Sequence, residues 1–198
     1  MVGETARLEV LTGAAIAEAI PGLARLRIAV FAEWPYLYDG DLAYEEAYLA
    51  DFASAADAAL VVACDGEQIV GASTASPMAA QTEDIRGPVE AAGYDVSEAF
   101  YFGESVLLPE YRGLGLGHGF FDAREAHARE CGAKHTLFAS VIRPADHPAR
   151  PESYRPLDGF WRARGYAPVE GLTCTMSWCD HGETNETVKR LQFWARSA

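Results

Sequence analysis

A glycine-rich loop between a strand-like run and an amphipathic run is the feature that most constrains this chain. Residues 112–119 read Arg-Gly-Leu-Gly-Leu-Gly-His-Gly, after the apolar run Phe100–Leu108 and before a helical pattern over Leu116–Cys131. Glycines at every second position leave one side of a turn free of side chains, so backbone N–H groups at a helix N-terminus can converge on an anion. The segment predicts a strand, a phosphate-binding loop and a helix, in that order.

The spacing of the glycines excludes two common nucleotide-binding loops. A P-loop needs Lys and then Ser or Thr after its last glycine, whereas Gly117 is followed by His118 and Gly119. A dinucleotide fingerprint needs G-x-G-x-x-G, but its last position would hold His118 or Phe120. The loop therefore has to serve another phosphate-bearing ligand.

The rest of the chain predicts one α/β domain over residues 1–198. Further strands are expected over Arg7–Leu11, Ala59–Cys64, Ile69–Ser76, Lys134–Ile142, Leu172–Trp178 and Val188–Ala195. Helices are expected in two pieces between Gly13 and Phe31, the second starting at Pro21, and over Leu42–Phe52 and Leu157–Arg164. The polar segment Gln81–Ala99 is interpreted as an excursion with one helical turn at Pro88–Ala92. The resulting sheet is mixed, with Lys134–Ile142 parallel to Phe100–Leu108.

The amino-acid composition limits the classes of molecule that the chain is expected to bind. The formal charge of −13 argues against nucleic acid, which needs clustered Lys and Arg, and is compatible with a cationic substrate, although excess acid also simply keeps a protein in solution. No apolar run approaches the roughly 18 residues of a membrane span, so a cytoplasmic enzyme without membrane contact is expected. The four cysteines are scattered, and no pair has the two-residue spacing of zinc or redox motifs, which predicts reduced thiols and no metal site.

Two segments resemble the GNAT (GCN5-related N-acetyltransferase) superfamily. Arg112-x-x-Gly115-x-Gly117, preceded by the residues from Val106 to Tyr111, is similar to its acetyl-coenzyme A signature, and Phe160–Tyr166 is similar to a later helix that reads Leu-Tyr-x-x-x-Gly-Phe. The resemblance implies a mixed, mostly antiparallel sheet, flanked by helices, whose central parallel strands splay to admit acetyl-coenzyme A. It also implies transfer of an acetyl group to an amine by direct attack on the thioester.

The same resemblance implies where the cofactor lies. The pantetheine arm is expected along the backbone of Val106, Leu107 and Leu108, and an N–H of this stretch is a candidate donor to the thioester oxygen. The pyrophosphate is expected on the loop formed by Gly113, Leu114, Gly115, Leu116, Gly117, His118 and Gly119. Arg112 is expected either to approach a phosphate or to brace the loop.

Catalysis of amine acetylation requires removal of a proton. A primary amine with a pKa of about 10.4 is almost wholly protonated at pH 7, so a nearby carboxylate, acting directly or through water, would assist. Glu104 is the candidate because it lies in the apolar run Phe100–Leu108, where a charged side chain is expected to have either an ion-pair partner or a functional role. The alternative is an exposed strand position for Glu104.

The remaining site residues are further from the motif. Trp161 occupies the place of the tyrosine that often protonates the departing thiolate in the family, so Tyr154 is the substitute candidate. Tyr36, Tyr38 and Asp39 lie in an aromatic connection between helices and are expected to border the pocket of a small-molecule amine.

Three alternatives stay open at this stage. The domain could bind an acyl-coenzyme A as a sensor or scaffold without transfer. The acceptor could instead be a protein N-terminus or a hydroxyl. A homodimer is compatible with the sequence, which contains no signal for or against one.

Overall fold

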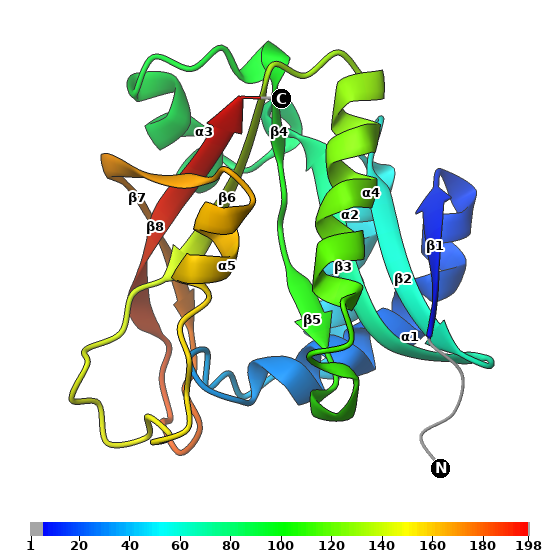
Figure 1. Cartoon of the computed structure of the whole chain (residues 1–198). Coiled ribbons are helices and arrows are strands. Elements are labelled where there is room, and N and C mark those ends of the chain that lie inside the picture. Colours follow the sequence, from blue (N-terminus) through cyan, green and yellow to red (C-terminus); the bar gives the residue numbers. More distant parts are fainter. Residues whose placement is uncertain (1–5, 198) are drawn as a thin grey trace.

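Eight strands form one sheet in the computed structural model, which describes residues 6–197. Their bounds are β1 Arg7–Thr12, β2 Ala59–Asp65, β3 Gln68–Pro77, β4 Ala99–Tyr101, β5 Ser105–Leu107, β6 His135–Val141, β7 Ala167–Trp178 and β8 Thr187–Ser197. The strand order is β1-β2-β3-β4-β6-β8-β7, and β5 also pairs with β3 (Figure 1). All pairings are antiparallel except the one between β4 and β6.

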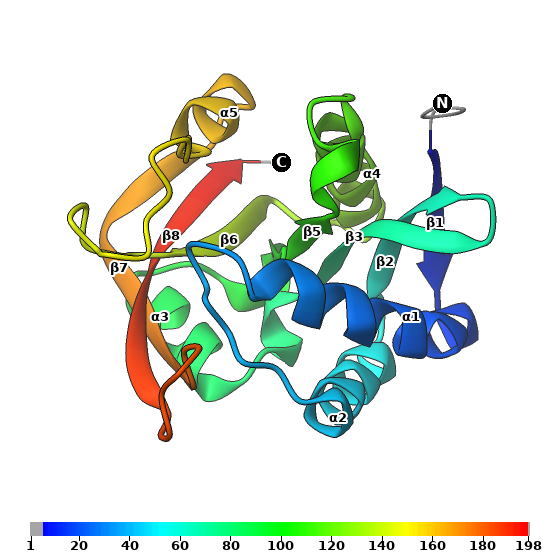
Figure 2. The same cartoon turned by 90° about the horizontal axis from the view of Figure 1, so that it is seen from below.

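Helices cover both faces of this sheet (Figure 2). On one face lie α1 Ala14–Phe31, α2 Leu42–Ser54 and α3 Glu83–Ala91. On the other lie α4 Leu116–Glu130 and α5 Asp158–Ala163. Short 3-10 turns occupy Met78–Ala80, Val96–Glu98 and Pro109–Tyr111. No helix within residues 6–197 is long and apolar enough to cross a membrane.

The sheet opens between its two central strands. The parallel pairing of β4 with β6 ends at Tyr101 and Leu137, and one further bond of 2.8 Å runs from the Phe102 N–H to the Leu137 carbonyl. Beyond this point β5 pairs with β3, β6 pairs with β8, and the two strands diverge (Figure 1). The predicted parallel pair and splay are confirmed. The prediction of one continuous strand over Phe100–Leu108 is wrong, because residues 102–104 interrupt it.

A buried arginine of α4 stabilises this interruption. Arg124 is 1% exposed, and its Nη1 donates to the carbonyls of Thr74, at 3.3 Å, and Glu104, at 3.1 Å. Its Nη2 donates to Ser105 Oγ at 2.9 Å, and its guanidinium carbon lies 4.5 Å from the centre of the Phe102 ring. Burial lowers the pKa of Arg124 to about 10, so the group remains charged at neutral pH. Each of these two carbonyls also accepts a backbone N–H, from Gly103 to Thr74 at 3.2 Å and from Thr74 to Glu104 at 3.1 Å, so Arg124 adds a second, charged donor to each.

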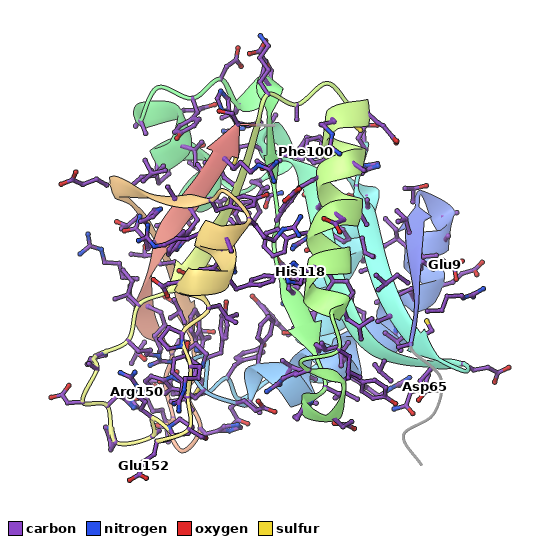
Figure 3. The ribbon with its side chains drawn as sticks, in the orientation of Figure 1. Glu9, Asp65, Phe100, His118, Arg150 and Glu152 are labelled. Atoms are coloured by element: carbon purple, nitrogen blue, oxygen red, sulfur yellow. The ribbon has the colours of Figure 1, made fainter. Side chains whose placement is uncertain are left out.

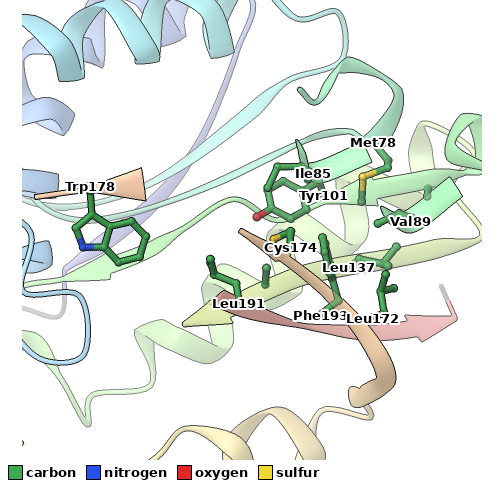
Figure 4. Packing of buried hydrophobic residues seen from close by; sticks show 12 residues of the cluster. Met78, Ile85, Val89, Tyr101, Leu137, Leu172, Cys174, Trp178, Leu191 and Phe193 are labelled. Carbon is green, nitrogen blue, oxygen red and sulfur yellow. The ribbon is translucent and has the colours of Figure 1, made fainter. Parts of the chain in front are cut away.

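Apolar clusters fix each helix against the sheet. Beneath α3, Ile85 and Val89 pack with Leu137 and Phe193 (Figure 4). The Tyr101 ring belongs to the same cluster, but its hydroxyl points away from Val89, toward the side on which Trp178 lies (Figure 4). Other clusters bury α1 and α2 against β2 and β3, and α4 against β2, β4 and β6. Both faces of the central strands are therefore covered.

Two helical predictions are wrong in detail. The two expected pieces between Gly13 and Phe31 form the single helix α1, which contains Pro21. The Pro21 side of the helix is exposed, whereas Ile16 and Leu23 are fully buried before and after it, so packing outweighs the lost hydrogen bond. The segment Gln81–Ala99 likewise contains the nine-residue helix α3, not a single turn.

Close packing in the centre of the sheet predicts that Gly71→Ala is destabilising. A Cβ atom at Gly71 would lie 2.5 Å from Leu107 Cδ1, 3.0 Å from Phe120 Cζ and 3.3 Å from the Val106 carbonyl oxygen. Overpacking of this kind costs about 1–3 kcal/mol, measurable as a lower free energy of unfolding in urea. The matched control is Gly159→Ala, where no atom lies within 4 Å of the added Cβ. Equal stability of the two variants would contradict the packing argument.

Candidate active site

The glycines of the loop have two different structural roles. Gly113 and Gly115 adopt φ values of +78° and +86°, which favour glycine, and Gly115 is the N-cap of α4. Gly117 and Gly119 lie inside the first turns of α4. The four alternating glycines therefore do not form one turn, because only Gly113 and Gly115 precede the helix. A Cβ atom at Gly119 would lie 2.2 Å from Leu8 Cδ1, so this glycine allows α4 to approach β1.

The start of α4 provides a cradle for an anion. No atom lies within 4 Å of a Cβ added to Gly113 or Gly115, so this side of the turn is open. Within residues 6–197, none of the backbone N–H groups of residues 113–117 donates a hydrogen bond. Free N–H groups at the N-terminus of a 15-residue helix attract phosphate oxygens.

Arg112 and His118 hold the loop and helix in place. Arg112 Nε donates to the Leu107 carbonyl at 3.0 Å, and its Nη1 pairs with Glu33 at 2.9 Å. Of the two roles expected for Arg112, the geometry supports bracing the loop. His118 lies between α4 and α5, with its ring 4.8 Å from Phe160 and its Nδ1 3.3 Å from Arg164 (Figure 3).

The backbone of β5 offers one free edge to the opening. The Leu108 N–H donates to the Val70 carbonyl at 2.9 Å, and Val106 pairs with Ala72. Polar groups alternate in direction along a strand, so those of Leu107 face away from β3. Among the three residues expected along the cofactor, Leu107 therefore has the N–H directed into the opening, whereas the Leu108 N–H is already used.

A cavity of about 320 Å³ lies beside β6 and β8, under the connection that follows β6. It is lined by Trp34, Pro35, Ser140, Val141, Ile142, Arg143, Arg150, Tyr154, Pro156, Asp158, Gln192 and Trp194. The Tyr154 ring meets the Trp34 ring edge-on at 6.0 Å, and Figure 3 places Arg150 on the same long connection between β6 and α5. Burial raises the pKa of Tyr154, which keeps the phenol protonated at neutral pH. Trp161 instead packs 5.0 Å from both Phe138 and Trp194.

Glu104 lies in the interruption between β4 and β5 and is not an exposed strand residue. Its side chain is 6% exposed, and its Oε1 pairs with Arg27 Nη1 at 2.7 Å. The backbone N–H of Glu104 donates to Thr74 Oγ1 at 3.2 Å. Arg27 Nε also donates to Glu45, so one cation of α1 joins a carboxylate of α2 and the carboxylate of Glu104. We refer to these three residues as the Arg27 cluster.

The aromatic connection between α1 and α2 brings two of its three predicted residues to this cluster. Burial, and next the charge of Glu104, raise the pKa of Tyr36 to about 12. Burial, and next the charge of Glu45, raise the pKa of Tyr38. Asp39 does not join them, because its side chain is 62% exposed and its Oδ1 lies 3.5 Å from His181 Nδ1.

A second set of buried charges ties this connection to the sheet. Arg143, after β6, donates from Nε to the Pro35 carbonyl at 2.8 Å and from Nη2 to the Tyr36 carbonyl at 2.6 Å. Its Nη1 pairs with Asp180 at 2.7 Å, and Lys189 of β8 contacts Asp180 at 3.2 Å. The backbone of Tyr38 also forms a β-bridge with Asp180. The connection is therefore fastened at its centre.

Four of these buried charged residues were not predicted, namely Arg27, Glu45, Arg124 and Arg143. A signal existed for the three that lie in helices. Arg27 follows the buried Leu23 by four residues, and Glu45 precedes the buried Leu49 by four. Arg124 likewise follows the buried Phe120 by four, so each lies on the inward face of its helix. The sequence does not reveal which partners they meet across the fold.

Comparison with known proteins decides the family. The profile of the Acetyltransferase (GNAT) family matches residues 26–152, nearly two thirds of the chain, including the opening, the loop and α4. The chain belongs to the GNAT acetyltransferase family. No curated protein sequence matches it significantly. Its biochemical class is accordingly that of an acyltransferase, with acetyl-coenzyme A as the cosubstrate.

Solved structures share the fold of this GNAT protein at low sequence identity. A ribosomal-protein-alanine N-acetyltransferase from Brucella melitensis has a TM-score of 0.62 at 15% identity, covering 97% of this chain and 99% of that chain. A phosphinothricin acetyltransferase from Sinorhizobium meliloti, in complex with acetyl-coenzyme A, has a TM-score of 0.58 at 16% identity, covering 98% and 89%. A putative acetyltransferase from Salmonella typhimurium, with its cofactor acetyl-coenzyme A, has a TM-score of 0.56 at 13% identity, covering 96% and 94%.

The anion cradle of the GNAT loop predicts that Gly117→Asp abolishes acetyl-coenzyme A binding. A carboxylate in the first turn of α4 is compatible with folding but repels phosphate. Wild-type protein should gain about 2.7 kcal/mol of stability at a hundredfold excess of ligand over Kd, seen as a higher Tm, and the variant should gain none. Gly117→Ala is the control, because its Cβ would meet only Phe160 Cζ, at 3.6 Å, and should keep the shift. An undiminished shift in folded Gly117→Asp would refute the loop assignment.

The charges around Asp180 predict that Asp180→Asn destabilises the fold by about 3 kcal/mol, because Arg143 and Lys189 lose their shared carboxylate. Burial alone would raise the pKa of Asp180, but the hydrogen bonds and charges of Arg143 and Lys189 outweigh it and lower that pKa. A lowered folded-state pKa contributes stability above the unfolded value and loses it as pH falls. Urea unfolding should therefore show a constant difference from wild type at pH 5–7, shrinking below about pH 4.

Asp146→Asn, an exposed carboxylate of the connection after β6, is the control for Asp180→Asn. It should change stability by no more than about 0.5 kcal/mol at every pH. A difference between wild type and Asp180→Asn that persists unchanged at pH 3 would show that the effect does not come from the ionised carboxylate.

Proposed function

We propose that this GNAT protein transfers the acetyl group of acetyl-coenzyme A to the amine of a small molecule. The observation that carries the proposal is the position of Glu104, whose buried carboxylate belongs to the segment at which the pairing of β4 with β6 ends. A carboxylate at this point can receive, directly or through one water, the proton that an ammonium must lose before its nitrogen attacks the thioester. Proton transfer and attack then need no covalent enzyme intermediate.

The closed acceptor side favours a small molecule over a polypeptide. The connection that carries Tyr36, Tyr38 and Asp39 is fastened to the sheet by Arg143 and bridged to the β7–β8 turn at Asp180. A segment held at its centre cannot swing aside to admit an extended chain. Aromatic rings and an excess of carboxylates suit a cationic amine, with the exposed Asp39 at the outer end of the connection.

Tyr154 is proposed as the acid that protonates the coenzyme A thiolate. Its phenol is protonated at neutral pH, with a pKa that burial raises further, and it lines the cavity beside β6 and β8. Trp161 carries no acidic proton at the position that the family motif gives to tyrosine, so a phenol from the preceding connection would replace it. Leu107, with its N–H directed into the opening, is the proposed donor to the thioester oxygen.

A screen of acceptors tests this proposal. Wild-type protein and Glu104→Gln are given acetyl-coenzyme A with small amines, with peptides bearing a free N-terminus, or with alcohols, and released coenzyme A thiol is measured. We expect release with small amines, slowed about 10²–10⁴-fold by Glu104→Gln at neutral pH and partly restored as rising pH frees the amine. The acetyl-coenzyme A shift in Tm should be equal in both proteins.

The other outcomes each favour a different reading. Release only with peptides or only with alcohols would replace the proposed acceptor. Tight binding of acetyl-coenzyme A without release in any acceptor class would favour the non-catalytic sensor. A wild-type rate in Glu104→Gln across pH 6–9 would remove Glu104 from the chemistry.

A further inference from the structure

The strongest arrangement outside the cofactor loop is the Arg27 cluster. Its three charged groups come from three elements, α1, α2 and the interruption between β4 and β5, and all are buried. The Arg27 guanidinium lies against two rings, 5.0 Å from Phe31 and 4.8 Å from Tyr48. Two rings and two carboxylates therefore fix its plane and direction.

Arg27 divides its donors between the two carboxylates. Its Nε donates to Glu45, and its Nη1 forms the ion pair with Glu104. Glu45 is 1% exposed, so it is a fixed anchor for the guanidinium. Burial alone would lower the pKa of Arg27, but the charges of Glu104 and Glu45 more than compensate and raise it. The cation is thus permanently present beside Glu104.

The cluster is not electrically neutral. One guanidinium faces two carboxylates, which leaves one negative charge in a buried region near the Tyr36 phenol. Glu104 Oε1 is buried and lies 2.7 Å from Arg27 Nη1, so the ion pair fixes the position of the carboxylate.

The backbone alone does not fix the Glu104 side chain. Residues 102–104 lie outside the β ladder, and Arg124 holds only the Glu104 carbonyl, on the α4 side. Without a partner, a carboxylate on a long side chain would sample several rotamers or turn toward water. Arg27 is the described residue that joins this side chain to the helices.

We infer that Arg27 is a positioning residue that holds the Glu104 carboxylate at the acceptor side, with Glu45 as its anchor. The inference rests on the proposed role of Glu104 as the base. Displacement of a catalytic group by about 1 Å can cost about 10²-fold in rate, so the loss of Arg27 should lower kcat without affecting acetyl-coenzyme A binding at the start of α4.

A double-mutant cycle tests the inference. The variants are Arg27→Gln, Glu104→Gln and the double variant, with Arg25→Gln as the matched control on the exposed side of α1. We expect Arg27→Gln to lower kcat about 10–100-fold with unchanged KM for acetyl-coenzyme A and an unchanged acetyl-coenzyme A shift in Tm. The double variant should be no slower than Glu104→Gln alone, because Arg27 acts through Glu104. Arg25→Gln should match wild type.

If the losses of kcat in the two single variants multiply in the double variant, Arg27 has a general structural role and the inference is overturned. A rise in KM for acetyl-coenzyme A that accompanies the loss of kcat in Arg27→Gln would overturn it in the same way. If Glu104→Gln lowers kcat but Arg27→Gln keeps the wild-type kcat, the inference is overturned and the proposed function stands. If Glu104→Gln keeps the wild-type kcat, both the inference and the proposed role of Glu104 fail. If Arg27→Gln does not fold, Arg27→Lys replaces it. Lysine keeps the charge but cannot reach both carboxylates as a planar fork, so kcat should again fall while the cofactor shift in Tm persists.

Discussion

The contacts of Arg124 with backbone carbonyls are the constraint on which the rest of the site depends. The Thr74 and Glu104 carbonyls each accept one backbone N–H at the break, and Arg124 of α4 donates a second hydrogen bond to each. A hydrogen bond to a charged group contributes about 1.5–3 kcal/mol. The N-terminus of the same helix carries the free N–H groups of the glycine turn. The opening of the sheet and the proposed phosphate site are therefore linked through one helix. Cosubstrate binding and the break between β4 and β5 belong to a single arrangement.

The break also explains why Glu104 faces the helices α1 and α2. A regular strand would alternate its side chains strictly between the two faces, with Phe100 and Phe102 on the α4 side. Residues 102–104 lie outside the ladder and need not follow that alternation. The Glu104 side chain therefore pairs with Arg27, while its carbonyl accepts a hydrogen bond from Arg124. Two arginines on opposite faces of the sheet thus hold one residue by different atoms.

The sequence predicted most of the fold and the glycine turn before α4 because both depend on local patterns. Alternating apolar residues, the glycine spacing at Gly113 and Gly115 and the order of elements are visible without knowing any long-range contact. The interruption after Tyr101 was not predicted, since the run from Phe100 to Leu108 is apolar throughout except for Gly103, Glu104 and Ser105. The residue that contacts the break from the neighbouring helix is Arg124, twenty residues after Glu104, and such a contact has no local signature. The same holds for Asp180, whose partners lie on β8 and after β6.

The use of arginine at all three irregular points follows from the geometry of its side chain. At Arg27, Arg124 and Arg143 the chain leaves regular structure or two elements meet at an angle, so the acceptors do not lie in a straight row. A guanidinium presents five donors in one plane and can join carbonyl and carboxylate oxygens from different segments, whereas an ammonium group is a point charge that is costly to dehydrate. Arg143 illustrates this by donating to Pro35, Tyr36 and Asp180 at once. The connection between α1 and α2, the Glu104 carboxylate and the break between β4 and β5 are consequently each held by one buried planar cation.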